Sequence, residues 1–291
     1  MTAPAASIGL IGGSGLYALA ELADAREVSV TTPFGAPSDA LLVGRFGDRP
    51  VAFLARHGRT HRILPGEINY RANIYAMKAL GVERILSASA VGSMKEGIHP
   101  RDVVLPDQFI DRTSRRVATF FGDGVAAHVA FADPVCPETR RVLCDAARAA
   151  GATVHDGGTY LCMEGPAFST RAESRLYRTW GVEVIGMTNL TEAKLAREAE
   201  ICYATLALVT DYDSWHAEED DVSVTAVLEN LRANAAVAAA ALRAAVLALP
   251  QSRATCHCGD ALSTAMITPV EAITPEARAR VGVLLDKYAA S

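Results

Sequence analysis

One pattern recurs along this chain and restricts its possible folds more than any other feature. A strand-like apolar run leads into a glycine-rich or polar cluster, and a helix-like stretch often follows. The strand-like runs cover residues 8–11, 51–55, 84–86, 182–185 and 203–209, and helices are expected over 69–80, 137–150, 170–180, 191–200 and 224–249. Strands that alternate with helices predict a mainly parallel sheet covered on both faces. The clusters would then meet at the carboxyl edge of the sheet, where open α/β sheets bind ligands.

The organisation of the chain favours a single domain. No internal repeat, linker or change of composition occurs before about Pro250. We therefore expect an α/β domain over residues 8–250, with a mixed, mainly parallel central sheet flanked by helices. A C-terminal tail over residues 251–291 is expected to pack on that domain. Of the 291 residues 50% are hydrophobic and 21% are charged, so the chain can bury a full core.

Charge and hydropathy argue against several classes of protein. The formal net charge of -5 argues against partners such as nucleic acid or a membrane surface, since both require basic patches. The longest apolar region, 233–250, is alanine-rich and contains Asn234 and Arg243, which is typical of a packed helix rather than of a membrane span. The first residues show no signal peptide, and the sequence predicts a cytoplasmic protein.

The 6 cysteines do not form a disulfide scaffold in a chain of this length. Four lie singly in or beside apolar segments, as buried reduced thiols do: Cys136, Cys144, Cys162 and Cys202. The run Cys256-His257-Cys258 could bind a soft metal or form a redox pair, but no second Cys/His pair lies nearby at zinc spacing. The pattern therefore favours an incidental or stabilising role over a catalytic one.

Asp211 and Asp213 directly follow the strand-like run 203–209. A carboxyl group at a strand's carboxyl end can donate a proton to a heteroaromatic leaving group or accept hydrogen bonds from an exocyclic amine. Taken alone, the pair is more typical of a solvated acidic loop, since residues 218–221 are also acidic.

The run Gly12-Gly13-Ser14-Gly15 follows the first strand-like segment. Residues 13–18 fit the dinucleotide pattern G-x-G-x-x-A, but the acid that should end a second strand is missing, because residues 30–37 form a Pro/Gly turn. A nicotinamide enzyme is therefore disfavoured. Ser14 and the exposed backbone N–H groups suit an oxyanion, and a simple tight turn is equally well supported.

Residues 56–61 place four basic or potentially basic side chains directly after a strand-like run. The planar guanidinium of Arg56 can bind two phosphate oxygens at once, and His57 can add a hydrogen bond or a proton near neutral pH. A solvated basic turn is the alternative. The anion-suited cluster at Ser14 favours the functional interpretation.

Two more strand ends add donors. Ser89 and Ala90 follow the run 84–86, and Thr188 lies at an expected helix N-terminus, where residues 189–192 resemble a capping box. Each cluster is weak evidence alone, because Ser and Thr cap helices routinely. Four donor-rich strand ends and one acidic strand end together indicate an enzyme that binds an anion on one side and a nitrogenous group on the other.

Eight motifs occur in one order, at residues 9–15 (GLIGGSG), 32–39 (TPFGAPSD), 55–61 (ARHGRTH), 107–113 (DQFIDRT), 164–173 (EGPAFSTRAE), 186–189 (GMTN), 198–204 (EAEICYA) and 210–213 (TDYD). As an ordered set they are far more specific than any one of them. Over roughly residues 8–249, the chain resembles the trimeric purine nucleoside phosphorylase family, and within it the members that cleave methylthioadenosine.

The resemblance implies the nucleoside phosphorylase fold, a homotrimer, and cleavage of 5'-methylthioadenosine by orthophosphate to adenine and 5-methylthioribose 1-phosphate. It implies small-molecule substrates, with orthophosphate as co-substrate and no metal or organic cofactor. The residues implied to hold phosphate are Ser14, Arg56, His57, Ser89, Ala90 and Thr188. Those implied to contact the nucleoside are Met187, Phe168, Ser169, Val224, Val227, His61 and, from a neighbouring subunit, His128.

The resemblance also separates the acidic pair. Asp211 is implied to protonate or hydrogen-bond purine N7, and Asp213 to accept from the 6-amino group. For the first role Asp211 must carry or share a proton at pH 7, so we expect its pKa to be raised by burial and by Asp213.

A phosphorylase for 6-oxopurine nucleosides or methylthioinosine is the alternative activity. A 6-oxo group is an acceptor and suits Asn at position 213 better than Asp. A non-catalytic nucleoside-binding protein, or a hydrolase, has no use for a complete set of anion donors. Residues 189–197 and the tail differ from the animal members, which leaves the preference between adenosine and methylthioadenosine open.

Overall fold

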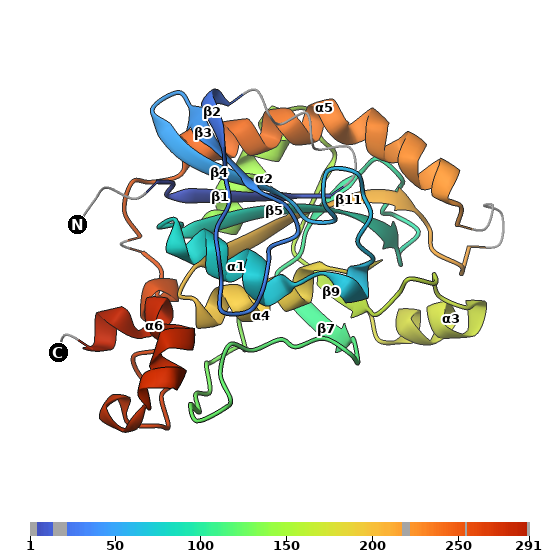
Figure 1. Cartoon of the computed structure of the whole chain (residues 1–291). Coiled ribbons are helices and arrows are strands. Elements are labelled where there is room, and N and C mark those ends of the chain that lie inside the picture. The colour runs from blue at the N-terminus through green and yellow to red at the C-terminus, as the bar shows by residue number, and fades with distance from the viewer. Residues whose placement is uncertain (1–4, 14–21, 217–221, 254, 290–291) are drawn as a thin grey trace.

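The computed structural model describes residues 5–13, 22–216, 222–253 and 255–289 (Figure 1). One sheet contains the strands β1 (Ile8–Gly12), β2 (Ala23–Val28), β3 (Leu41–Phe46), β4 (Arg49–Ala55), β5 (Arg84–Ser93), β6 (Val103–Leu105), β7 (Gln108–Arg112), β8 (Val154–Asp156), β9 (Thr159–Met163), β10 (Val184–Gly186) and β11 (Cys202–Asp211). The helices are α1 (Tyr70–Ala79), α2 (Pro137–Ala149), α3 (Arg171–Thr179), α4 (Asn189–Glu198), α5 (Val224–Ala248) and α6 (Pro275–Ala289), with short 3-10 turns η2 (Pro65–Glu67), η3 (Cys258–Asp260) and η4 (Val270–Ala272).

Strand β5 is the centre of the sheet, because it pairs with three other strands. Most of it runs parallel to β1 and β11, with Arg84 opposite both Ile8 and Cys202. Its last residues, Gly92 and Ser93, pair antiparallel with β10. Parallel pairs predominate over antiparallel ones in the whole sheet, which confirms the predicted mixed, mainly parallel architecture.

Helices cover the sheet on both faces, as the alternating pattern predicts (Figure 1). Helices α2 and α5 pack against each other and against β11 on one face, and α1 and α4 lie on the other. Helix α5 is long and apolar enough to cross a membrane by length and composition. In the structure it buries Leu231, Leu242 and Val246 within the protein, which agrees with the predicted packed helix.

The predicted capping box at the start of α4 is wrong. The helix begins at Asn189 itself, and the cap residue Thr188 makes no side-chain capping hydrogen bond. The Asn189 amide instead donates to Tyr203, and Glu192 pairs with Arg56. Both side chains are buried, so tertiary partners rather than the helix end satisfy their polar groups.

The sequence places the polar cluster at Ser89 after a strand. In the structure it lies inside one. Strand β5 continues from Arg84 to Ser93 because its neighbours pair along its whole length.

The C-terminal tail lies against the face of the sheet that α1 and α4 cover (Figure 1). Val281, Leu284 and Leu285 of α6 are buried in the same apolar cluster as Ile74 of α1 and Phe120. The backbone N–H of residue 128 also bonds to the carbonyl of residue 265, so the tail holds the loop that precedes α2.

Candidate active site

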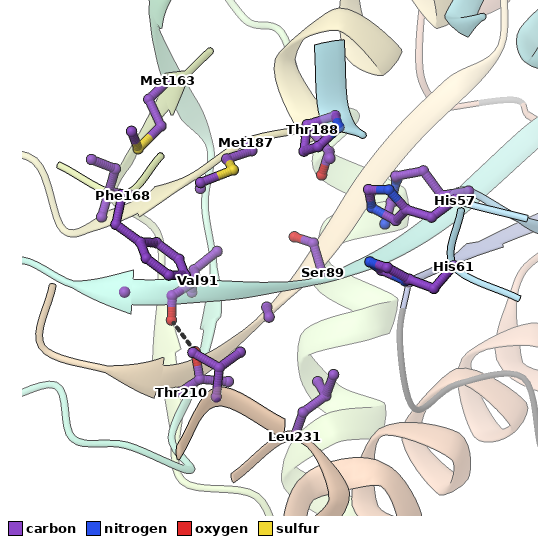
Figure 2. Close-up of a pocket in the computed structure, with 18 of the residues that line it drawn as sticks. His57, His61, Ser89, Val91, Met163, Phe168, Met187, Thr188, Thr210 and Leu231 are labelled. Atoms are coloured by element: carbon purple, nitrogen blue, oxygen red, sulfur yellow. Dashed lines mark hydrogen bonds between the residues drawn. The ribbon is translucent and has the colours of Figure 1, made fainter. Parts of the chain in front are cut away.

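A cavity of about 290 Å³ opens at the carboxyl ends of β4, β5, β10 and β11. Most of the predicted site residues line it: Arg56, His57, His61, Ser89, Ala90, Phe168, Met187, Thr188, Asp211, Asp213 and Val227. The two histidines lie on one side and Met163, Phe168 and Met187 on the other, with Ser89 and Thr188 between them (Figure 2). The cavity is therefore at the sheet edge where the sequence predicts ligand binding.

Three predicted site residues are not among the described residues that line the cavity, and a fourth, Ser14, lies outside the described residues. Ser169 is buried next to the cavity, with its hydroxyl 3.7 Å from the Met163 sulfur. Val224 begins α5 and is 64% exposed. His128 lies in a separate hollow with neighbours that include Phe121 and Phe131.

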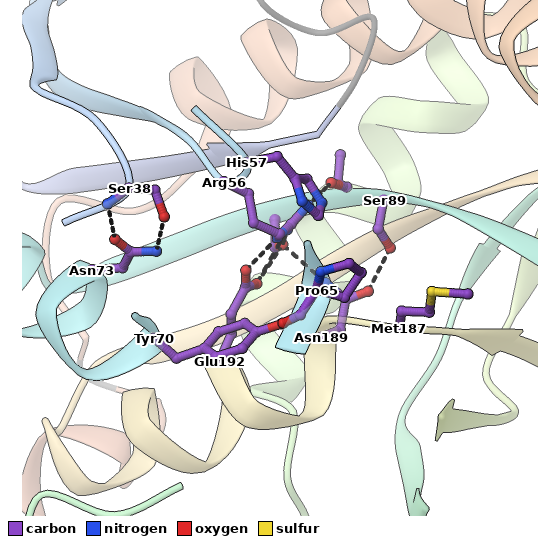
Figure 3. Close-up of polar contacts among 12 residues, drawn as sticks. Ser38, Arg56, His57, Pro65, Tyr70, Asn73, Ser89, Met187, Asn189 and Glu192 are labelled. Atoms are coloured by element: carbon purple, nitrogen blue, oxygen red, sulfur yellow. Dashed lines mark hydrogen bonds and ion pairs between the residues drawn. The ribbon is translucent and has the colours of Figure 1, made fainter. Parts of the chain in front are cut away.

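Arg56 is fully buried and forms a bidentate ion pair with Glu192 (Figure 3). Its Nε lies 2.5 Å from Glu192 Oε1, while Nη2 donates to Glu192 Oε2 and to Ser87. Nη1 donates to the Ala88 carbonyl at 2.9 Å. A guanidinium has five N–H donors. The contacts with described residues use four of them, so one on Nη1 can bind a ligand. Gly13, which follows β1, lies close to this atom, since a Cβ there would be 3.4 Å from it.

Glu192 belongs to a buried hydrogen-bond network that the sequence analysis missed. The Ser87 hydroxyl and the Tyr203 hydroxyl both donate to Glu192 Oε2 at 2.8 Å. Asn189 accepts a 2.5 Å hydrogen bond from Ser89, which lines the cavity (Figure 3). Because each member orients the next, the network holds the Arg56 guanidinium and the Ser89 hydroxyl oxygen at the cavity wall. The sequence does not indicate this network, because polar residues such as Asn189 and Glu192 at the start of a helix are also typical of helix caps.

His57 is neutral at pH 7. Its Nδ1 lies 2.8 Å from the Ile63 carbonyl, so Nδ1 carries the proton and Nε2 is an acceptor. Burial, with the positive charge of Arg56, lowers the pKa of His57 to about 4. The His61 ring stacks on it at 4.5 Å, and burial lowers the pKa of His61 as well. This side of the cavity therefore presents an acceptor that suits a hydroxyl group or a protonated anion oxygen.

Thr188 presents an unpaired donor to the cavity. Its Oγ1 is buried, and no atom of the described residues makes a hydrogen bond to it. Thr188 is also the cap residue of α4, where the helix N-terminus favours negative charge. A buried hydroxyl without a partner is costly, so a bound anion would supply what this group lacks.

Asp211 ends β11 on the opposite side of the cavity, and its pKa is raised. Burial raises the pKa of Asp211 to about 6 and the charge of Asp213 adds to this, although hydrogen bonds from Thr210 and from the Asp213 backbone oppose it. The Thr210 hydroxyl lies 2.7 Å from Asp211 Oδ2 and 3.2 Å from the Val91 carbonyl. One hydroxyl proton cannot serve both acceptors. When the Thr210 hydroxyl donates to the Val91 carbonyl, a proton on Asp211 Oδ2 can be donated to the Thr210 oxygen.

Asp213 presents an unpaired acceptor. Its Oδ2 is buried and has no hydrogen-bond partner among the described residues. Burial raises the pKa of the carboxyl group, although hydrogen-bonding groups of Ser174, Ser214 and Ser169 near it oppose this shift. The backbone here has φ 51°, in the left-handed region that Asp and Asn tolerate better than most side chains. Gly92 packs against the pair, since a Cβ atom there would lie 2.8 Å from Asp211 Oδ1.

Arg116 is a second residue that the sequence analysis missed. Its guanidinium is buried and donates to the Met187 carbonyl at 2.5 Å and to the Glu164 carbonyl at 2.8 Å. It therefore joins the ends of β9 and β10 beneath the cavity and positions Met187. Arg115 and Arg116 stand next to each other in a loop, so nothing in the sequence marks one of the two arginines as buried.

Comparisons with known proteins agree with the resemblance that the motifs indicate. Residues 7–247 match the family model of the phosphorylase superfamily. An S-methyl-5'-thioadenosine phosphorylase of Koribacter versatilis (strain Ellin345) is 56% identical over 97% of this chain and 97% of its own length. One of the same name from Geobacter sulfurreducens is 58% identical over 97% of this chain and 98% of its own length.

Solved structures agree as well. The crystal structure of a methylthioadenosine phosphorylase sourced from an antarctic soil metagenomic library has a TM-score of 0.91 and 50% identity, covering 97% of this chain and 100% of that chain. The Schistosoma mansoni methylthioadenosine phosphorylase in complex with adenine has a TM-score of 0.79 and 39% identity, covering 83% of this chain and 91% of that one. The predicted family and fold are thereby confirmed.

Proposed function

The chain belongs to the phosphorylase superfamily, and we propose that its cavity catalyses phosphorolysis of S-methyl-5'-thioadenosine. Orthophosphate displaces adenine from C1' of the ribose, giving S-methyl-5-thio-α-D-ribose 1-phosphate, as a pentosyltransferase of purine and methionine salvage does. The relatives named above share nearly the full length of this chain. The observation that carries the proposal is the pair of unpaired groups in one cavity, a donor at Thr188 and an acceptor at Asp213.

Phosphate is proposed to bind at the end of the cavity formed by Arg56, Thr188 and Ser89. The charge of Arg56 is already balanced by Glu192, so this end supplies directed N–H and O–H donors rather than net positive charge. The N-terminus of α4 adds its dipole. His57 Nε2 suits the proton of a monohydrogen phosphate or a ribose hydroxyl. Ser14 and Ala90 complete the proposed phosphate set.

The proposed reaction breaks the bond between C1' and N9 while a phosphate oxygen forms the new bond to C1'. The transition state carries positive charge on the ribose, which the phosphate anion stabilises, and negative charge on the departing purine. A protonated Asp211 donates its proton to N7 and so neutralises that charge. With its pKa raised to about 6, about a tenth of Asp211 carries a proton at pH 7, far more than for an ordinary aspartate. No organic cofactor is needed, since phosphate is itself the nucleophile.

Base recognition is proposed to depend on Asp213. Its unpaired Oδ2 can accept from the 6-amino group of adenine, whereas a 6-oxo group would leave two acceptors facing each other in a buried site. Phe168 and Met163 supply apolar surface at this end, and Ser169 lies behind Met163.

The 5' end of the nucleoside is proposed to lie between His61 and the start of α5. Val227, Leu228 and Leu231 line the cavity there, while Val224 is exposed at the start of α5. An apolar pocket of this kind discriminates against a 5'-hydroxyl by about 1–3 kcal/mol. Met187, held by Arg116, is proposed to contact the ribose.

We also propose a cytoplasmic homotrimer in which His128 reaches the 5' end of a neighbouring subunit's cavity. Two observations support this assembly: His128 does not line the cavity of its own chain, and it lies in an open hollow with apolar neighbours such as Phe131. Sedimentation at micromolar protein concentration tests the assembly, and a monomer with full activity would contradict it.

One assay tests the proposed reaction. Adenine release from methylthioadenosine is measured with and without phosphate, and then with inosine and methylthioinosine as substrates. We expect release that requires phosphate and prefers the 6-amino substrate. Release without phosphate would overturn the phosphorylase assignment, and a preference for inosine would overturn the assignment of the base.

The variant Asp213→Asn tests base recognition separately. An Asn amide can donate to a 6-oxo group, so selectivity should shift toward methylthioinosine. Unchanged activity and selectivity on methylthioadenosine would show that Asp213 does not read the 6-position. Glu271→Gln, an exposed change in the tail, is the control.

A further inference from the structure

Four of the six cysteines converge far from the cavity. The Sγ atoms of Cys136, Cys202, Cys256 and Cys258 all lie within 4.8 Å of one another. Three of these side chains are buried and Cys256 is partly buried. Among the described residues, their own apolar cluster contains these cysteines and no aliphatic side chain. The group therefore differs from cysteines that merely fill space in a core, such as Cys144.

The spacing of the sulfur atoms suits a tetrahedral metal site. Four thiolates around one Zn²⁺ at about 2.3 Å place their sulfurs about 3.8 Å apart. Here Cys202 and Cys256 are 3.4 Å apart, and all other pairs lie within the 4.8 Å limit. Each of the four sulfur atoms lies within this limit of the other three, as four ligands of one ion require, whereas disulfides pair sulfur atoms two by two at about 2.05 Å.

We propose that Cys136, Cys202, Cys256 and Cys258 together bind one Zn²⁺ ion in a structural site. Four sulfur ligands in tetrahedral arrangement select zinc over the hard cations, which prefer oxygen. Four protein ligands leave no position for water, so the site is structural and takes no part in phosphorolysis.

The surroundings of the sulfurs suit thiolate ligands. The Thr139 hydroxyl lies 3.3 Å from the Cys136 sulfur, as a hydrogen bond around a metal ligand would. Cys136 is the cap residue of α2, where the helix N-terminus favours negative charge.

A buried cation lies on the neighbouring strand. Arg84 faces Cys202 across the β5–β11 pair and its side chain is 1% exposed. Its Nη2 donates to the Ser252 carbonyl and lies 3.8 Å from Glu138 Oε2, so a buried ion pair already balances its charge. Its Nε has no hydrogen-bond partner among the described residues. One zinc with four thiolates would carry two negative charges, and a guanidinium on the neighbouring strand would offset part of them.

The site would fasten the C-terminal tail to the body of the protein. Cys136 begins α2 and Cys202 begins β11, whereas Cys256 and Cys258 belong to the tail that continues into α6. The tail buries Val281 and Leu285 against α1 and α4, and zinc would add a second anchor at its start.

The metal content of the intact protein tests the proposal. The protein is produced with zinc in the medium, purified without a metal-affinity tag under reducing conditions, dialysed, and measured by mass spectrometry of its metals. We expect about one zinc per chain. Replacement by cobalt should give the intense visible and near-ultraviolet bands of tetrahedral thiolate coordination. Less than a tenth of a zinc per chain, with six free thiols, would overturn the proposal.

Two variants make the test specific. Cys256→Ser should lower the zinc content at least tenfold, and because Cys256 is the most exposed of the four it is the least disruptive to change. Cys144→Ser removes a buried cysteine outside the group and should keep the zinc. Equal zinc content in both variants would overturn the proposed ligand set.

Alkylation under denaturing, non-reducing conditions separates zinc from oxidised thiols. All six cysteines should react once a chelator has been added. Fewer than six reactive thiols would indicate a disulfide within the group and would overturn the proposal. Iron with inorganic sulfide in place of zinc would overturn it too.

Discussion

The two ends of strand β11 differ in how their reactive groups are satisfied. At its last residue, Asp211, the strand meets a cavity whose buried polar groups include an unpaired acceptor on Asp213 and an unpaired donor on Thr188. At its first residue, Cys202, the strand meets three other cysteines that contact one another. Nine residue steps place these ends about 30 Å apart.

The difference shows which end is prepared for exchange with ligands. Buried polar groups without partners destabilise a fold, and they persist at functional sites where a substrate will satisfy them. At the cysteine end the four sulfur atoms contact one another or one proposed ion, and the unpaired groups there, such as Arg84 Nε, do not line the cavity. One strand thus joins a site that is open to ligands and a site that is closed.

The largest expected effect is at the open end. Asp211→Asn removes the proton donor and should lower kcat by about 10²–10⁴-fold, since general acids contribute about that much. Steady-state adenine release from methylthioadenosine measures it. A variant within threefold of the wild type would mean that another group protonates the purine. Zinc content should not change.

The same variant should have a higher free energy of unfolding, because it removes the buried titrating carboxyl group of Asp211. The folded pKa of Asp211 is raised to about 6 from 3.8, so the folded protein binds more protons than the unfolded chain between these values. Stability therefore falls as the pH rises from about 4 to about 6. Replacing a carboxyl group whose pKa is raised by this much should increase the free energy of unfolding by up to about 3 kcal/mol at pH 7.

Denaturant unfolding at pH 7 and at pH 4 measures this gain. Asn keeps the geometry, because its amide can donate to Thr210 while its carbonyl accepts from the Asp213 backbone. The gain should disappear at pH 4. A gain that is equal at both pH values would show that it does not come from the titration of Asp211.

Gly92→Ala tests how closely the open end is packed. A Cβ atom would lie 2.8 Å from Asp211 Oδ1, so the carboxyl group must move. A displacement of this kind should lower kcat/KM by about 10²-fold. Gly97→Ala is the matched control, since nothing lies within 4 Å of a Cβ there. Equal activity of the two variants would show that Asp211 can shift without loss.

The smallest expected effect is the coupling between the two ends. In the double variant Asp211→Asn with Cys256→Ser, the changes in unfolding free energy should add within about 0.5 kcal/mol, as they do for distant independent sites. Unfolding of the two single variants and the double variant measures the coupling. A coupling above about 1 kcal/mol would mean that β11 transmits strain between its ends.

Much of the open end could be predicted from the sequence. Asp211, Arg56 and Thr188 each follow or end a strand-like run, and parallel strands bring their carboxyl ends to one edge, so the pattern already brings these residues together. The partners Glu192 and Arg116 could not be predicted. Their polar side chains lie in a helix and a loop where exposed residues look the same, and only packing decides that they are buried.

The group of four cysteines at the closed end could not be predicted from the sequence. A metal site is recognised in a sequence by pairs of ligands at short spacing, and here only Cys256 and Cys258 are close neighbours. Cys136 and Cys202 join them because α2, β11 and the tail meet at one end of the sheet.

By itself, then, the sequence determined the alternation of strands and helices, the family and the residues at the strand ends, because hydrophobic periodicity and ordered motifs are local properties. The tertiary structure alone decided which buried polar groups have partners. Satisfaction of a hydrogen bond or a thiolate depends on atoms that are distant along the chain and meet only after folding.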